Sequence, residues 1–157
     1  MRRVTTFLGT AAIVLMATSA YAQAPNFAGT WTIDAEKTAS ANPAPAGGAG
    51  GRMGGGGRMG GPLTVTQDAA KLVISRTMGE NVMTTTYNLD GSPSKNAGGR
   101  GGEVTSTAKW DGAKLVVTSD NGQTVTYHMD GAWLVQSTTQ PGREGGPAMT
   151  RMTYYKK

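Results

Sequence analysis

The sequence predicts an all-β protein whose antiparallel strands form an up-and-down meander that closes into a barrel of about eight to ten strands. Short runs rich in Thr, Val and Tyr alternate between apolar and polar residues, which is typical of strands with one buried face. The breaks between several runs carry Asp-Gly or Asn-Gly, which suit two-residue hairpin turns. A meander with one apolar face must close or stack to hide that face from water, so we expect a barrel.

The first element is a secretory signal peptide over residues 1–22. Arg2 and Arg3 precede a short apolar run at 7–16, and Ala-Tyr-Ala at 20–22 forms a small-x-small cleavage site. The apolar run is too short to span a bilayer comfortably, and no later stretch is apolar enough to be a transmembrane helix. We therefore expect cleavage near Ala22, no transmembrane segment, and a mature protein in the periplasm or outside the cell.

The mature chain, residues 23–157, is predicted to be a single domain with a Gly-rich flexible loop at 41–62. The chain contains 24 Gly, and the hexamer Gly-Gly-Arg-Met-Gly-Gly occurs twice in succession at 50–61. Such a segment has little apolar surface to bury and a high entropic cost of ordering, so we expect a linker without helix. Its arginines leave open a weak contact with anionic envelope surfaces, whereas a secreted destination argues against nucleic acid as the partner.

Nine strands are predicted, with tight turns at 79–80, 111–112, 121–122 and 130–131. The sequence Asp-Gly-Ala-Lys-Leu-Val at 111–116 recurs as Asp-Gly-Ala-Trp-Leu-Val at 130–135, which indicates two similar hairpins. The aspartates of these turns are interpreted as turn residues and not as calcium ligands. We expect less than a turn or two of helix outside the leader. The predicted strands span 29–34, 63–67, 71–78, 81–89, 103–110, 114–119, 123–129, 132–139 and 148–156.

Residues 26–34, Asn-Phe-Ala-Gly-Thr-Trp-Thr-Ile-Asp, resemble the Gly-x-Trp opening of the calycin group, which includes lipocalins and fatty-acid-binding proteins. With Thr-Thr-Thr-Tyr at 84–87 and Ser-Thr-Ala-Lys-Trp-Asp-Gly at 106–112, the sequence is similar to small secreted bacterial lipocalin-like proteins of uncharacterised function. The resemblance implies a lipocalin-like barrel. It also implies structural roles for Gly29 and for Trp31, which is expected to plug one end of the barrel.

The last predicted strand resembles that of fatty-acid-binding proteins but departs from it in one respect. That family carries Arg-x-Tyr there, with both side chains pointing inward to hold a carboxylate. In this sequence Arg151 and Tyr154 are three residues apart and face opposite sides, while Arg151 shares its face with Thr153 and Tyr155. Fatty-acid binding in the manner of that family is therefore not expected.

The candidate ligand-binding residues are Arg76, Tyr87 and Tyr127. Arg76 interrupts the apolar face of the strand 71–78, and a buried charge must be paired or must face a wet cavity. Arg76 therefore either holds an acidic ligand or pairs with a neighbouring Asp or Glu. Tyr87 and Tyr127 lie on the apolar faces of their own strands, where they would supply contact area and hydroxyl donors.

Catalysis has few suitable residues, because the chain has no Cys and one His, and its carboxylates fall mostly in turns. We expect no enzymatic activity, no cofactor and no metal site, and we expect His128 to be an exposed strand residue. Two functions remain. The first is a carrier that takes a small apolar or amphiphilic molecule into the barrel. The second is a non-enzymatic structural or interaction protein of the cell envelope, with a barrel filled by side chains. A cavity above roughly 300 Å³ would favour the carrier.

Overall fold

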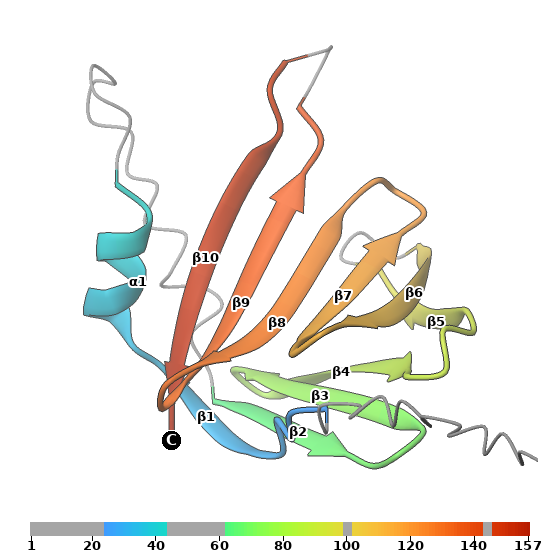
Figure 1. Cartoon of the computed structure of the whole chain (residues 1–157), viewed down its shortest axis with the longest axis horizontal. Coiled ribbons are helices and arrows are strands. Elements are labelled where there is room, and N and C mark those ends of the chain that lie inside the picture. Colours follow the sequence, from blue (N-terminus) through green and yellow to red (C-terminus); the bar gives the residue numbers. More distant parts are fainter. Residues whose placement is uncertain (1–23, 44–61, 99–101, 143–145) are drawn as a thin grey trace, which may run out of the picture.

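The computed structural model describes residues 24–43, 62–98, 102–142 and 146–157, so the predicted signal peptide lies outside the described residues. The described strands form one antiparallel sheet in the order β4-β3-β2-β1-β10-β9-β8-β7-β6-β5, which curls round until its two ends meet (Figure 1). This confirms the predicted up-and-down barrel. The elements are β1 (Gly29–Ile33), α1 (Ala35–Ala41), β2 (Leu63–Gln67), β3 (Lys71–Met78), β4 (Asn81–Asn88), β5 (Ser94–Ala97), β6 (Glu103–Asp111), β7 (Lys114–Ser119), β8 (Thr124–Asp130), β9 (Trp133–Gln140) and β10 (Met149–Lys156).

Two elements were not predicted. β5 consists of Ser-Lys-Asn-Ala, which has neither β-branched residues nor apolar alternation. α1 follows Asp34, whose side-chain Oδ1 accepts the backbone N–H of Lys37 at 3.1 Å and so caps the helix start. The first residue of the loop predicted at 41–62 is therefore the last residue of α1, and residues 44–61 lie outside the described part of the chain.

α1 covers an edge of β10 that β1 leaves unpaired. β1 pairs with β10 only at Thr32 and Ile33, beside the end of β10. Farther along the same strand, Thr38 Oγ1 accepts the N–H of Tyr154 at 3.0 Å, and the Asn42 side chain both accepts from and donates to the backbone of Met152, at 2.9 and 2.7 Å. Side chains of α1 and its C-cap thus satisfy backbone groups that would otherwise form an open sheet edge.

Side chains also join the two edge strands, β4 and β5. Asn96 Oδ1 accepts the N–H of Thr86 at 2.8 Å, and Asn96 Nδ2 donates to the carbonyl of Thr86 at 2.9 Å. Ser94 Oγ accepts the N–H of Asn88 at 2.8 Å, and Asn88 Nδ2 donates to the carbonyl of Pro93 at 3.0 Å. We call this line of contacts the β4–β5 seam, because it closes the barrel without a backbone ladder.

The hydrophobic core lies on the inner face of the curled sheet. Its centre is built from residues that alternate along the strands and point inward, as the period of two predicted. No helix among the described residues is long and apolar enough to cross a membrane. The buried core residues are Phe27, Trp31, Leu63, Val65, Leu72, Ile74, Tyr87, Ala108, Leu115, Val117, Val125, Tyr127, Leu134 and Tyr155.

Candidate functional site

Polar side chains from three strands meet inside the barrel. The guanidinium Nη2 of Arg76 on β3 donates to Oε1 of Gln136 on β9, and the hydroxyl of Tyr155 on β10 donates to the same oxygen at 3.2 Å. The guanidinium carbon of Arg76 lies 6.0 Å from the centre of the Tyr155 ring. β3 and β9 are not neighbours in the sheet, so only the curling of the sheet brings Arg76 and Gln136 together. We call Arg76, Gln136 and Tyr155 the interior polar cluster.

The two predicted tyrosines lie beside this cluster. Tyr87 is 8% exposed and Tyr127 is 4% exposed, and their ring centres are 6.5 Å apart. Burial raises the pKa of Tyr87, of Tyr127 and of Tyr155, while the positive charge of Arg76 acts in the opposite direction on all three. The three hydroxyls therefore remain protonated at neutral pH and can donate hydrogen bonds inside the barrel.

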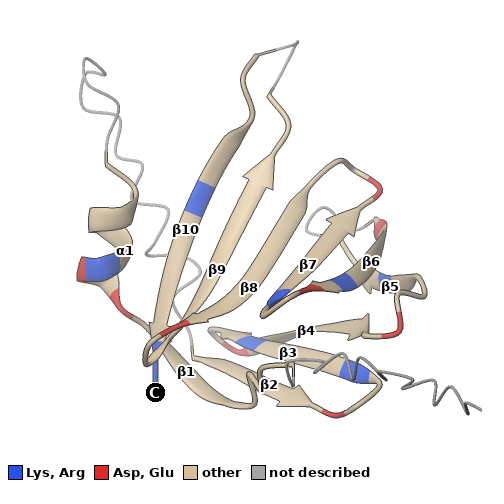
Figure 2. Ribbon diagram, viewed as in Figure 1, with Lys and Arg blue, Asp and Glu red and all other residues tan. Residues whose placement is uncertain are grey.

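The charge of Arg76 has a neutral partner. Arg76 is half-buried, and none of the three ion pairs formed within the described residues includes it. Acidic residues lie mostly at turns and strand ends (Figure 2). The sequence leaves two roles open for Arg76, holding an acidic ligand or pairing with a neighbouring Asp or Glu. Within the described part of the structure, Arg76 pairs with no carboxylate.

Arg151 lies on the same face of β10 as Tyr155 but nearer the open end, where its side chain is exposed. Tyr154 lies on the outer face, where the Lys37 ammonium is 4.9 Å from its ring centre. Arg151 and Tyr154 therefore do not form a joint carboxylate site. Gln136 belongs to the interior polar cluster but was not predicted as a site residue. The signal was present in the sequence, because Gln136 lies two residues after the buried Leu134 and so on the same, inner face of β9.

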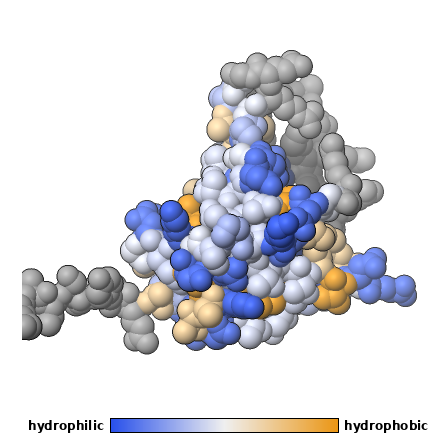
Figure 3. Space-filling model, turned by 90° about the vertical axis from the view of Figure 1, so that its right-hand side faces the viewer, coloured by the Kyte–Doolittle hydropathy of each residue, from blue (hydrophilic) through white to orange (hydrophobic). Residues whose placement is uncertain are grey.

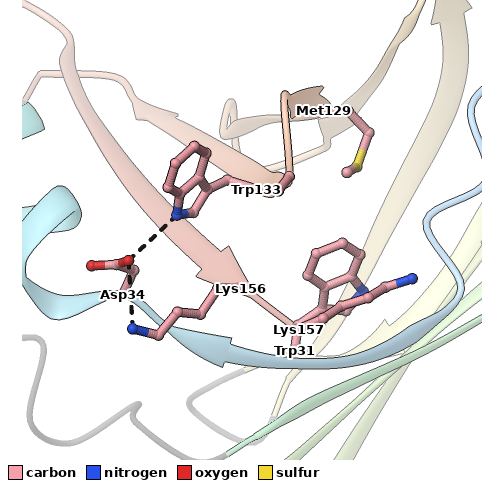
Figure 4. A pocket seen from close by; sticks show the side chains of 7 residues that line it. Trp31, Asp34, Met129, Trp133, Lys156 and Lys157 are labelled. Carbon is pink, nitrogen blue, oxygen red and sulfur yellow. Dashed lines mark hydrogen bonds and ion pairs between the residues drawn. The ribbon is translucent and has the colours of Figure 1, made fainter.

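A pocket of about 390 Å³ opens at the end of the barrel where β10 ends and the β8–β9 turn lies (Figure 1 and Figure 4). None of the three predicted ligand-binding residues lines it, so it does not represent the interior space that the sequence suggests. We call it the end pocket. It is lined by Trp31, Asp34, Met129, Ala132, Trp133, Lys156 and Lys157.

The Gly-x-Trp sequence forms one wall of the end pocket. Trp31 is 1% exposed, and its indole N–H donates to the carbonyl of Phe27 at 2.9 Å. The Lys157 ammonium lies 5.0 Å from the Trp31 ring centre. Gly29 has a φ of +140°, and a Cβ there would lie 3.0 Å from Cε of Lys157. The positive φ therefore favours glycine at position 29, and a larger residue there would also displace the end of the flexible Lys157 side chain.

Trp133 forms the opposite wall and is held from two sides. Its indole N–H donates to Oδ2 of Asp34 at 3.3 Å, and the Lys37 ammonium lies 3.5 Å from its ring centre. The Lys156 ammonium lies 3.6 Å from the same Asp34 oxygen. The backbone N–H of Lys37, the Trp133 indole and the Lys156 charge together hold the pKa of Asp34 below its usual value.

The prediction that His128 is exposed is wrong. His128 is half-buried on the outer face of β8, next to the buried Val135 of β9, and its Nδ1 is buried without a hydrogen-bond partner. Burial lowers the pKa of His128, and the charge of Lys114 lowers it further. Neighbouring strands cover the ring, which a period of two along a single strand does not reveal. The described residues include no group of three His, Cys, Asp or Glu that could hold a metal.

Exposed apolar side chains are few and scattered on the face seen in Figure 3, where hydrophobic spots are separated by polar surface. The large exposed hydrophobic residues of the described chain lie on the hairpin strands β4 and β10. They are Val82, Met83, Met149 and Met152. This face therefore offers no continuous apolar surface for a protein partner.

No protein-family model matches the sequence, and no curated protein matches it. Solved structures do match its architecture. The chain has the calycin fold. Zebrafish ileal bile acid-binding protein, solved with cholic acid, superposes with a TM-score of 0.62 at 18% identity, over 83% of this chain and 98% of that chain. Human cRBP IV gives a TM-score of 0.61 at 12% identity, over 85% and 98% of the two chains. The REP1-NXSQ fatty acid transporter gives 0.58 at 12% identity, over 83% and 94%.

Proposed function

We propose that this protein is a non-enzymatic binder of a small apolar or amphiphilic molecule with an acidic group, which it takes into the barrel. The observation that carries the proposal is the interior polar cluster. Arg76 brings a half-buried positive charge into an apolar interior, and its hydrogen-bond partner there is the neutral Gln136. A charge withdrawn from water requires compensation, which an anionic ligand group would supply.

Three buried tyrosines define the rest of the proposed site. The hydroxyl of Tyr155 lies within the cluster, and Tyr87 and Tyr127 provide ring surface next to it. An amphiphile would place its acidic group at Arg76 and lay its apolar part along these rings, toward the open end. Names of the structural neighbours support this class of ligand, because they refer to a bile acid in one case and to fatty acid in another.

Binding of two matched probes tests the proposal. Dodecanoate and dodecanol have the same chain and differ in charge, so only the anion gains from Arg76. We expect Arg76→Met to weaken dodecanoate at least about 10-fold, or roughly 1.4 kcal/mol, and to leave dodecanol unchanged. Isothermal titration calorimetry gives both affinities. Circular dichroism should show that the variant keeps its fold.

Arg151→Met is the matched control, because it removes an arginine from the same side of the barrel at an exposed position. It should leave both affinities nearly unchanged. A larger effect of Arg151→Met than of Arg76→Met would place the anion at the rim and contradict the proposal. Failure of both probes to bind would contradict the proposal and favour the alternative, a structural or interaction protein of the envelope with a filled barrel.

We also propose that the protein acts in the periplasm or outside the cell, after cleavage near Ala22. The charged start, short apolar run and small-x-small site of residues 1–22 support this location. Expression of the full chain in a bacterial host, followed by fractionation and mass measurement, tests it. The expected product begins at Gln23 and is found outside the cytoplasm, whereas a cytoplasmic chain of full length would contradict the proposal.

A further inference from the structure

We infer that the end pocket is a second binding site, outside the barrel interior, for a small aromatic anion. This inference does not rest on the proposed barrel ligand, because the two sites share no lining residue among those argued above. The end pocket has about 390 Å³, which fits a molecule of one or two rings.

The walls of the end pocket supply aromatic and apolar surface. Trp133 supplies the accessible ring, and Met129 and Ala132 contribute apolar atoms (Figure 4). Trp31 also lines the pocket, but it is nearly fully buried and Lys157 lies over its ring. Lys37 covers one face of the Trp133 ring and does not line the pocket, so another part of the ring faces a ligand. The bond to Asp34 and the contact with Lys37 fix the Trp133 ring in place. A flat aromatic ligand therefore meets a surface that is already ordered, which lowers the entropic cost of binding.

The side-chain charges of the end pocket favour an anion. The ammonium groups of Lys156 and Lys157 line it together with one side-chain carboxylate, that of Asp34. The carboxylate is already engaged: Oδ1 accepts from Lys37, while Oδ2 accepts from Trp133 and pairs with Lys156. Lys157 makes no ion pair with an Asp or Glu among the described residues and lies over the Trp31 ring. Its ammonium is therefore the group in the pocket available to an incoming anion.

The arrangement of the end pocket explains why its ligand needs both an aromatic ring and a negative charge. A simple inorganic anion would meet Lys157 but leave the Trp133 ring without contact. A neutral aromatic would cover the Trp133 ring and leave the Lys157 charge without a partner. A planar ring carrying a sulfonate or carboxylate satisfies both at once.

Nuclear magnetic resonance of the three indole N–H groups provides the first test, with naphthalene-2-sulfonate as the probe. We expect the signals of Trp31 and Trp133 to shift on titration. Trp110 does not line the pocket, and its ring packs on Phe27 with ring centres 5.7 Å apart, so its signal serves as an internal control. Naphthalene-2-sulfonamide, the neutral analogue, should bind at least about 5-fold more weakly.

Variants separate the end pocket from the barrel site. Lys157→Met keeps an aliphatic chain over Gly29 and removes the charge, so it should weaken the sulfonate about 5-fold or more and preserve the fold. Trp133→Leu should weaken both probes. Lys71→Met removes an exposed lysine that does not line the pocket, and it should have no effect. Arg76→Met should also leave sulfonate binding unchanged.

Three results would overturn the inference: unshifted signals of Trp31 and Trp133, equal affinity for the sulfonate and the sulfonamide, or unchanged binding in Lys157→Met. Loss of sulfonate binding in Arg76→Met would likewise overturn it, by placing the probe inside the barrel. Because dodecanoate tests the barrel and the sulfonate tests the end pocket, failure of one proposal is distinguishable from failure of the other.

Discussion

Trp31 is the residue that separates the barrel core from the end pocket. It belongs to the buried core, and it also lines the pocket outside. Its position depends on Gly29, which leaves room for Lys157, and on the bond from its indole N–H to Phe27. One side chain therefore stabilises the barrel and forms the inner wall of a separate site.

Trp31→Ala should lower the free energy of unfolding by roughly 3–5 kcal/mol, the range for truncating a large buried aromatic. The reason is its nearly complete burial between the core and Lys157. Urea denaturation measures the loss. Thr30→Ala on the exposed face of the same strand is the control and should cost far less. A loss below about 1 kcal/mol for Trp31→Ala would show that Trp31 does not plug the barrel.

His128 should make stability depend on pH near neutrality. Burial and the Lys114 charge lower its pKa in the folded state, so the unfolded chain binds the proton more readily. Stability is therefore fully present above the unfolded pKa of about 6.5 and is lost as the pH falls through the lower folded value. Asp34, Asp68 and Asp90, whose pKa values are also lowered, act in the same direction but in a more acidic range, below their usual value of 3.8.

His128→Gln removes the only histidine of the chain and isolates this effect. The free energy of unfolding of the variant should be nearly constant where that of the parent declines just below neutral pH. Chemical denaturation at a series of pH values makes the comparison. Parallel curves for the two proteins would assign the dependence to other groups.

At the scale of elements, side-chain contacts complete the sheet in two places where backbone ladders stop. α1 and Asn42 cover the open edge of β10, and Asn96 bridges β4 and β5 at the seam. In this contact the Asn96 amide uses one donor and one acceptor, as a backbone peptide unit in a strand ladder does. Each of these two sets of contacts depends on a few side chains, so a single substitution can remove it.

Asn96→Ala should destabilise the protein by about 1–3 kcal/mol, because it leaves the N–H and the carbonyl of Thr86 without their partner. Hydrogen exchange at Thr86 should accelerate, since the seam opens locally. Lys95→Ala is the neighbouring control; Lys95 is exposed and pairs with the exposed Glu103 at 2.8 Å, so its loss should cost less than about 1 kcal/mol. Unchanged exchange at Thr86 in Asn96→Ala would show that other contacts hold the seam.

For the whole molecule, the sequence predicted nine of the ten strands to within one residue at each end, because alternation and turn residues are local signals. β5 was not predicted because its four residues show no apolar alternation. α1 was not predicted because its signal, Asp34 before a run of helix formers, adjoins the Gly-rich segment.

The alternation of apolar residues also placed Arg76 on an inner face of the barrel. Alternation did not predict Gln136 as the partner of Arg76. The two residues are 60 positions apart in the sequence, and they meet only because the sheet curls. The end pocket depends in the same way on the meeting of β1, β10 and the turn before β9.

The pairing of β1 with β10 also determines when folding can finish. Thr32 and Ile33 have their partners at Lys156 and Tyr155, at the opposite end of the sequence. A chain leaving the ribosome can form its hairpins one after another, but it cannot bury Trp31 under the closed sheet until the final strand has been made. Sheets that depend on such distant pairs close slowly. An unfinished chain therefore remains open throughout its synthesis, and the proposed secretion would use that interval, because an export channel for unfolded polypeptides must engage the proposed signal peptide before the barrel closes.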